Sequence, residues 1–196
     1  ITNPSYVGYM YGSTFNSSYE LTHVNDNSSS IKTELDNWYV TNIVNKNLEK
    51  YIADSGFCND RSLNEGDGVT TTANTNFGGY RRYVNHNPSL ICPNASNDLF
   101  TVDNASGNQA LTYPIGLITV DEVSVAGQSQ GFINRLSYTY SSSHYWTMTP
   151  SAFLASQNAA RAFIITPDGD SGNNLVSNLY GIRPVINLAS DVEIES

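Results

Sequence analysis

Short apolar runs separated by polar turns dominate the last part of the chain, between residues 144 and 188. Residues 145–148 form an aromatic and branched run, and residues 162–166 form a second run rich in β-branched side chains. Such residues favour strands because they pack well on a pleated, half-buried surface. We expect the first strand to stop at Pro150. The predicted core of this sheet consists of Trp146, Phe163, Ile164, Val185 and Ile186.

The segment 167–172 predicts a turn after the second run, since its Gly and Asp residues tolerate the backbone dihedrals that turns require. Residues 175–180 are then expected to form the returning arm of a hairpin. Gly181 interrupts this arm, and residues 182–188 form the last predicted strand. Pro184 lacks an N–H group, so this strand lies at an edge or is irregular there. We interpret 144–188 as a rigid sheet that presents a polar, ligand-facing surface.

Helical spacing of apolar residues is clearest over 31–44, and serines 28–30 offer N-terminal caps. The apolar face of this predicted helix carries Ile31, Leu35, Trp38 and Tyr39. Trp38 is therefore expected in the core, like Trp146. A further short helical piece is predicted over 48–53.

A capping box marks the start of a second predicted helix. Thr119 is followed three residues later by Glu122, a spacing in which each side chain satisfies an exposed backbone donor near the other residue. We expect this helix to run to about Ala126 and to stop at Gly127.

The chain between residues 56 and 108 has little periodicity, and we interpret it as a long irregular insert. Its basic, aromatic segment 80–83 is expected to contribute short strands together with 89–91 and 99–102. Near the N-terminus, residues 6–11 are predicted to form a first strand.

Composition narrows the class of partner. The 196 residues fit a single domain, because no repeat or composition break divides them. The net charge of −9 argues against nucleic acid, whose phosphates attract Lys and Arg, and it equally disfavours an anionic membrane surface. No run approaches the roughly 20 apolar residues of a membrane helix, so direct membrane insertion is not expected.

Cys58 and Cys92 are the two cysteines, and both lie in loop-like sequence that contains Asn or Pro. If the chain is exported, we expect a disulfide between them, because oxidising compartments preserve such bonds. Closing this loop would stabilise the fold by roughly 4 kcal/mol in the chain-entropy model. Two free thiols are the alternative.

Two serine motifs resemble catalytic ones but lack the context that catalysis requires. Residues 127–131 match the nucleophile-elbow pattern G-x-S-x-G, yet a predicted helix precedes the serine where that fold has a strand. No acid lies between Ser129 and His144, the last histidine, so the chain order of a triad is not met. Ser29 and Lys32 match S-x-x-K, but we expect Lys32 on a solvated first helical turn, where it is a poor base.

Metal and cofactor motifs are incomplete. Asp168, Asp170 and Asn173 resemble the start of a calcium loop, but the closing bidentate acid is missing, which favours a hairpin turn. The histidines have no zinc spacing, and no phosphate loop or dinucleotide fingerprint occurs. We therefore expect neither a metal nor a cofactor, and no enzymatic activity.

Six segments of the chain form a combination that is more specific than any one of them. They are DNWY at 36–39, FCNDRS at 57–62, residues 114–126, YWTMTP at 145–150, residues 162–166 and YGIRPVINL at 180–188. Together they resemble an uncharacterised family of surface proteins from Gram-positive gut bacteria, some of which carry pilin-like leaders. The resemblance covers nearly the whole chain.

That family is similar to the formylglycine-generating-enzyme form of the C-type-lectin-like fold. The resemblance implies an α+β domain in which two helices pack on small, twisted, mostly antiparallel sheets. The enzyme branch uses a late cysteine pair as its copper site, but no cysteine follows Cys92, so oxidase activity is not implied. Another branch comprises the hypervariable ligand-display proteins made by diversity-generating retroelements, whose variable residues lie on the corresponding late segment.

We therefore expect a secreted or cell-surface module that binds a protein or glycan ligand, as in adhesion, without catalysis. The alternatives are the globular head of a pilin-like structural subunit whose N-terminal helix has been removed and, third, a hydrolase.

The predicted recognition face combines Tyr and Arg, which bury much area on binding, with Asn and Ser, whose hydrogen bonds adapt. Its residues are Ser151, Phe153, Arg161, Asn173, Asn174, Asn178 and Tyr180, joined by Tyr80 and Arg81 from the insert. We expect the hairpin at 168–174 and the segment 151–161 to form one contiguous outer face. Alternatively, these residues are ordinary solvated surface.

Overall fold

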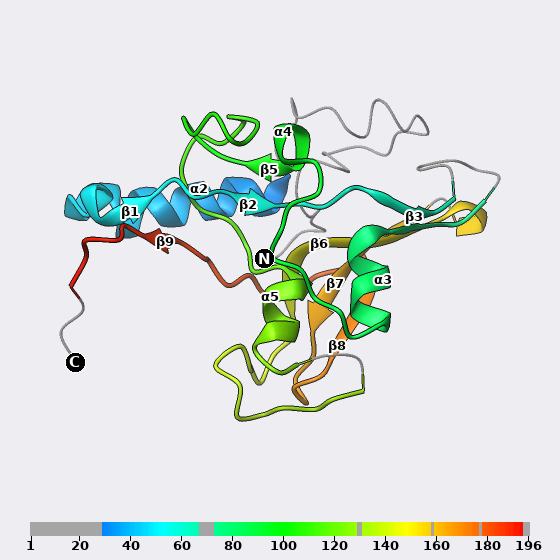
Figure 1. Ribbon diagram of the computed structural model, residues 1–196. Coiled ribbons are helices and arrows are strands. Elements are labelled where there is room, and N and C mark those ends of the chain that lie inside the picture. Colours follow the sequence, from blue (N-terminus) through cyan, green and yellow to red (C-terminus); the bar gives the residue numbers. More distant parts are fainter. Residues whose placement is uncertain (1–28, 67–72, 129–130, 158, 177, 194–196) are drawn as a thin grey trace.

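The computed structural model describes residues 29–66, 73–128, 131–157, 159–176 and 178–193. Within these ranges the chain is a mixed α+β structure with a few short helices and antiparallel sheets (Figure 1), which confirms the predicted α+β class. None of the described helices is long and apolar enough to cross a membrane. The expected strand at 6–11 lies outside the described residues.

A five-stranded sheet with the strand order β3-β4-β6-β7-β8 forms the centre of the structure. Its strands are β3 (Leu63–Glu65), β4 (Thr75–Phe77), β6 (Tyr145–Leu154), β7 (Ala159–Ile165) and β8 (Ser171–Leu175). The long hairpin of β6 and β7 carries both apolar runs that the sequence predicts as strands. β3 and β4 come from the expected insert at 56–108, so part of that segment is built into the main sheet.

Strand β6 continues through Pro150, so the predicted end of the strand at this residue is wrong. Pro150 lies opposite Ala162 of β7, and the register is irregular on both sides of this pair. Such irregularities accommodate a residue that cannot donate a hydrogen bond to the ladder. The compensation depends on the partner strand, and no local pattern indicates it.

The predicted turn after β7 is confirmed, with Gly169 at φ +87°, a left-handed conformation that glycine adopts without steric penalty. The returning arm is β8, which begins at Ser171 and ends at Leu175. It therefore starts earlier than the arm predicted at 175–180.

Two small antiparallel sheets flank the main one. β1 (Ile52–Ala53) pairs with β9 (Asn187–Leu188), and β2 (Phe57–Cys58) pairs with β5 (Leu99–Phe100). Of the last strand predicted at 182–188, only β9 forms a ladder, preceded by a single bridge between Gly116 and Val185.

The described helices are α2 (Ser30–Asn42), α3 (Gly78–Val84), α4 (Ala95–Asp98) and α5 (Val120–Val125), with 3-10 turns η1 (Val44–Lys46), η2 (Glu49–Tyr51) and η3 (Ala155–Gln157). Ser29 caps α2 as predicted, and the capping box of Thr119 and Glu122 starts α5 as predicted. Segment 80–83 lies in α3 rather than in a strand. Among the other short strands expected in the insert, 99–100 forms as β5, whereas 89–91 does not form a strand.

Both faces of the main sheet are covered. Trp146 and Ile164 lie on one face and belong to the same core cluster as the buried side of α2. Phe163 lies on the other face, where Tyr83 of α3 and Val120 of α5 pack against it. Of the predicted core, Trp146, Phe163 and Ile164 are buried, whereas Val185 and Ile186 are only partly buried against the cluster that contains Trp146.

Two side chains of α2 differ from the prediction. Trp38 is 37% exposed, because the buried stripe follows Ile31, Leu35 and Tyr39, and Trp38 lies beside it. Lys32 is buried instead of solvated, and its ammonium contacts the carboxylate of Asp36, one turn along the helix. Burial lowers the pKa of this ammonium, although the carboxylate opposes the shift.

Candidate functional site

Two residues of the predicted recognition face are fully buried. Ser151 and Phe153 lie on β6, the central strand whose two faces are covered, so neither can contact a ligand at the surface. Their assignment to an exposed face is therefore wrong. A strand that ended at Pro150, as predicted, would have left the following residues in a surface segment.

The sheet divides other predicted residues between its two faces. Arg161 and Asn173 lie on the face toward α3, and the Arg161 guanidinium donates to the Asn173 side-chain oxygen at 3.0 Å. Asn174 lies on the opposite face, since successive strand residues alternate. Its amide donates to the Tyr180 hydroxyl at 2.6 Å, and its oxygen accepts from the Asn178 amide at 2.7 Å.

The residues predicted from the insert lie on α3. Tyr80 is partly buried, with its ring centroid 6.4 Å from that of Phe163, so it lies on the same side of the sheet as Arg161. Arg81 is exposed.

The expected contiguous outer face does not form, because the two hairpins that share β7 turn at opposite ends of this strand. β7 has seven residues and spans roughly 20 Å, so about this distance separates the two turns.

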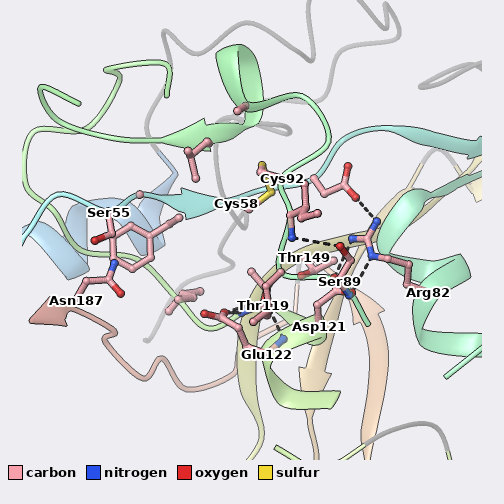
Figure 2. A pocket seen from close by; sticks show the side chains of 18 residues that line it. Ser55, Cys58, Arg82, Ser89, Cys92, Thr119, Asp121, Glu122, Thr149 and Asn187 are labelled. Atoms are coloured by element: carbon pink, nitrogen blue, oxygen red, sulfur yellow. Dashed lines mark hydrogen bonds and ion pairs between the residues drawn. A yellow bond between two sulfur atoms is a disulfide. The ribbon is translucent and has the colours of Figure 1, made fainter. Parts of the chain in front are cut away.

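A pocket of about 460 Å³ lies where β2, β5, α3, α5 and β6 meet (Figure 2). Its lining comes from residues between 55 and 187, so no single sequence motif could reveal it. Charged side chains gather on one side of it, next to the first turn of α5. The apolar lining is Phe57, Leu90, Ile91, Leu99 and Leu117.

Arg82 joins two carboxylates at the base of the pocket. Its guanidinium donates to the two carboxylate oxygens of Asp121 at 2.7 and 2.8 Å, and a third nitrogen lies 2.8 Å from Asp60 Oδ2. Asp60 also accepts from the Ser62 backbone N–H at 2.9 Å. The two hydrogen bonds that Arg82 donates to Asp121 raise the pKa of Arg82, so this guanidinium is permanently charged. The cluster ties α3 to Asp60, two residues after β2, and to α5.

The first turn of α5 forms a second charged part of the pocket wall. The Glu122 carboxylate accepts from the Thr119 backbone N–H at 2.7 Å and from the Thr119 hydroxyl at 2.8 Å. The Val120 backbone N–H donates to the Thr149 hydroxyl on β6 at 2.9 Å, which anchors the helix start to the main sheet.

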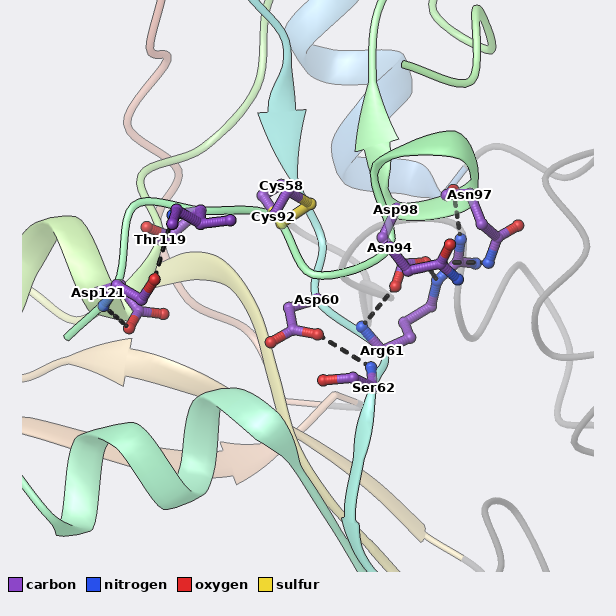
Figure 3. Close-up of a disulfide and its surroundings, with 12 residues drawn as sticks. Cys58, Asp60, Arg61, Ser62, Cys92, Asn94, Asn97, Asp98, Thr119 and Asp121 are labelled. Carbon is purple, nitrogen blue, oxygen red and sulfur yellow. Dashed lines mark hydrogen bonds and ion pairs between the residues drawn. A yellow bond between two sulfur atoms is a disulfide. The ribbon is translucent and has the colours of Figure 1, made fainter. Parts of the chain in front are cut away.

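The outer wall of the pocket is held by the disulfide and by one hydrogen bond. Cys58 of β2 is bonded to Cys92 with a Cα–Cα distance of 5.6 Å, which confirms the predicted disulfide (Figure 3). The Ser89 backbone N–H donates to Asp121 at 2.9 Å. Between these two attachments, Leu90 and Ile91 are 69% and 78% exposed. The wall is thus fixed at its ends while its apolar side chains remain accessible.

A second ion pair secures the neighbouring segment. Arg61 is completely buried, and its Nε donates to Asp98 Oδ1 at 2.7 Å while its backbone N–H donates to Oδ2 at 3.1 Å. Burial raises the pKa of the Asp98 carboxyl, although Arg61 opposes the shift. Asp60 and Arg61 point to opposite sides of the chain, so this dipeptide attaches to α3 on one side and to α4 on the other (Figure 3).

The pocket carries a net formal charge of −2, because Asp60, Asp121 and Glu122 face one cation, Arg82. Each of these carboxylates already accepts hydrogen bonds from the protein. Such groups are held in fixed positions and suit electrostatic recognition of a cation better than proton transfer to a substrate. The arrangement fits a ligand with a cationic head and an apolar stem.

The residues Ser29, Lys32 and Asp168 of the catalytic and metal motifs take structural places. The Ser29 hydroxyl accepts from the Lys32 backbone N–H at the start of α2, and Ser129 lies outside the described residues. In the part of the chain that the structure describes, no three His, Cys, Asp or Glu side chains gather as a metal site. Asp168 lies in the turn between β7 and β8, where a hydrogen bond from the Thr166 hydroxyl lowers the pKa of its carboxyl.

The sequence contains signals for single parts of the pocket, but nothing in it indicates that these parts lie together. The capping box located Thr119 and Glu122, and the cysteines marked one wall. Arg82 followed the predicted site residues Tyr80 and Arg81, but its two partners lie 22 and 39 positions away, so their pairing depends on the fold.

Comparison of the chain with models of protein families, with curated proteins and with solved structures gave no match.

Proposed function

We propose that this chain is a non-catalytic extracellular binding module with a C-type-lectin-like fold, whose ligand enters the pocket between the disulfide and α5. The α+β architecture with small antiparallel sheets supports the fold proposal. The Cys58–Cys92 disulfide supports export, since such bonds persist in oxidising compartments.

The observation that carries the proposal is the combination of apolar walls with a fixed, negatively charged base. The walls are tied by the disulfide and by the Arg82 cluster, so little conformational entropy is lost when a ligand binds. The net negative charge attracts a cation, and the exposed Leu90 and Ile91 offer contact to its apolar stem. The ligand that fits best is a protein ligand that presents an Arg or Lys side chain beside an apolar residue.

A peptide pair tests this proposal by calorimetry. An amidated peptide with Arg between two Leu residues is compared with its citrulline counterpart, which keeps the shape and removes the charge. We expect the Arg peptide to bind at least about 10-fold more tightly, the discrimination that one charge-assisted hydrogen bond provides. The difference should shrink with added salt.

A pocket-filling variant supplies the site-specific control. Ser55 is exposed and lines the pocket, so Ser55→Trp places a large ring in it with little effect on the core. Ser190→Trp adds the same ring at an exposed position outside the pocket lining. We expect Ser55→Trp to abolish peptide binding and Ser190→Trp to retain it. Equal binding of the citrulline peptide, or unchanged binding by Ser55→Trp, would refute the proposal.

A further inference from the structure

The loop that follows α5 exposes an unusual amount of apolar surface. Leu136 is 97% exposed, and Phe132, Ile133 and Tyr138 are each at least 60% exposed. We name these four side chains the loop knob. Large apolar side chains gathered on one exposed segment are typical of an interaction surface.

The loop knob is held in place by the main sheet. The Asn134 backbone N–H donates to the Gly169 carbonyl at 3.2 Å, and Arg135 Nε donates to the Asp168 carbonyl at 3.1 Å. The Leu136 backbone N–H donates to the Asn134 side-chain oxygen at 3.0 Å. These bonds fix the loop against the β7–β8 turn, so its apolar side chains are presented without a large ordering cost.

The loop knob lies in a part of the chain that differs in charge from the rest. The sequence holds 18 Asp and Glu residues, yet none lies between residues 123 and 167. Arg135 lies in the same loop, between Ile133 and Leu136, and is exposed, and it interacts electrostatically with the Asp168 carboxylate of the neighbouring turn. The knob is therefore apolar and lies beside one cation, whose charge Asp168 partly offsets, and it complements a surface that is apolar and acidic.

The pocket of the same chain is such a surface. Its wall exposes Leu90 and Ile91, and its charged side chains carry a net charge of −2. The pocket lies at the first turn of α5, whereas the loop leaves the opposite end of this helix and lies away from β2 and β5 (Figure 1). The loop is anchored to the β7–β8 turn, and Phe132 packs edge-on against His86 at a ring-centroid distance of 5.5 Å, so the loop is held apart from the first turn of α5.

We propose that the partner of the pocket is a second copy of this chain, whose loop knob docks at the exposed wall with Arg135 directed toward the carboxylates. This inference rests on the proposed binding role of the pocket. Knob and pocket are different surfaces, so the contact is head-to-tail and each pair of molecules keeps one free knob and one free pocket. Such contacts propagate into open chains unless the rotation closes a ring.

Sedimentation of the purified chain tests the proposal through two separate variants. Leu136→Asp places a charge on the knob at a fully exposed position, and Ser55→Trp fills the pocket. Leu179→Asp serves as the control, because Leu179 is an exposed leucine outside both surfaces. For a small interface we expect weak association, with the mean mass of the parent and of Leu179→Asp rising between about 10 µM and 1 mM. Each test variant alone should remain monomeric.

Mixing the two variants gives the sharpest result. Leu136→Asp retains a pocket and Ser55→Trp retains a knob, so their mixture should form one-to-one dimers and stop there. A parent chain that stays monomeric at every concentration would overturn the proposal, as would self-association of Ser55→Trp at the parent's strength. Sedimentation of the monomeric parent with phosphatidylcholine vesicles would instead assign the knob to a lipid surface.

The Arg peptide separates failure of this inference from failure of the proposed function. Leu136→Asp has an intact pocket and should bind the peptide as the parent does. If the peptide binds while the parent remains monomeric, the pocket recognises cations but its partner is another molecule. If neither peptide binding nor self-association occurs, both proposals fall.

Discussion

Arg82 is the residue whose removal should damage the pocket most. We consider Arg82→Met, which keeps much of the aliphatic length and removes the guanidinium. Asp60 and Asp121 would then lie buried without their shared cation, since they are only 2% and 4% exposed. The perturbation leaves the backbone of α3 and the apolar cluster around Phe163 in place.

The expected loss follows from the three contacts that disappear. Arg82 makes two hydrogen bonds to Asp121 and one ion pair to Asp60, all at 2.7–2.8 Å, and its side chain is only 18% exposed. Removing one partner of a buried ion pair destabilises a protein by about 3–5 kcal/mol, because the remaining charge is uncompensated. For a chain of this size such a loss lowers Tm by roughly 10 °C.

Denaturant unfolding at several pH values is the assay. In Arg82→Met the two buried carboxylates repel each other, and protonation of either one relieves the repulsion. The native variant should therefore take up protons more readily than its unfolded chain, so lowering the pH favours the native state. We expect the deficit relative to the parent to be largest near pH 7 and to shrink toward pH 4.

Arg81→Met is the matched control, because Arg81 is the preceding residue of the same helix and is exposed. Its loss should change the free energy of unfolding by no more than about 0.5 kcal/mol. The reasoning is refuted if Arg82→Met costs less than about 1 kcal/mol, or if its deficit does not depend on pH.

Four further changes test the core, the disulfide and a buried charge by denaturant unfolding. Trp146→Ala should cost about 3–5 kcal/mol because the residue is fully buried, whereas Trp38→Ala should cost about 1 kcal/mol or less. Reducing the Cys58–Cys92 bond should cost about 4 kcal/mol, since it closes a loop of 34 positions, and an unchanged midpoint would contradict this. Lys32→Met should stabilise by about 1 kcal/mol near pH 7, because burial disfavours the ammonium more than the Asp36 carboxylate favours it. This gain should shrink as the pH rises toward 10.5, because the native parent lysine loses its proton at a lower pH than the unfolded one, and a gain independent of pH would count against it.

Features that depend on neighbours three or four positions away could be predicted from the sequence. The cap at Ser29, the capping box of Thr119 and the left-handed turn at Gly169 are of this kind. The backbone groups at these positions are satisfied within one turn, so the local pattern contains the whole interaction. The core position of Trp146 followed from an apolar run that forms a strand.

Features that depend on the partner strand or on a second layer could not be predicted. Pro150 predicts the end of a strand, but an irregular register with β7 accommodates it. Ser151 and Phe153 then continue a strand that is covered on both faces, where polar and apolar side chains alike are buried. Tyr80 and Arg161 lie on one side of the sheet, and Asn174 lies on the other. The side chains of successive strand residues alternate between the two faces, so the predicted residues could not share a single face.

The two kinds of electrostatic interaction in the pocket should respond differently to salt. The Arg82–Asp121 and Arg61–Asp98 pairs are largely buried, so dissolved ions screen them little and the shape of the pocket should persist at high ionic strength. A cation that enters from solvent is screened until it is seated, so its affinity should fall as salt is added. The two effects can be measured on one sample, because Tm reports the buried pairs and calorimetry reports the ligand. Loss of affinity at constant Tm between 50 mM and about 500 mM salt is the expected result. A parallel fall in Tm would mean that the buried pairs are more solvated than their burial indicates.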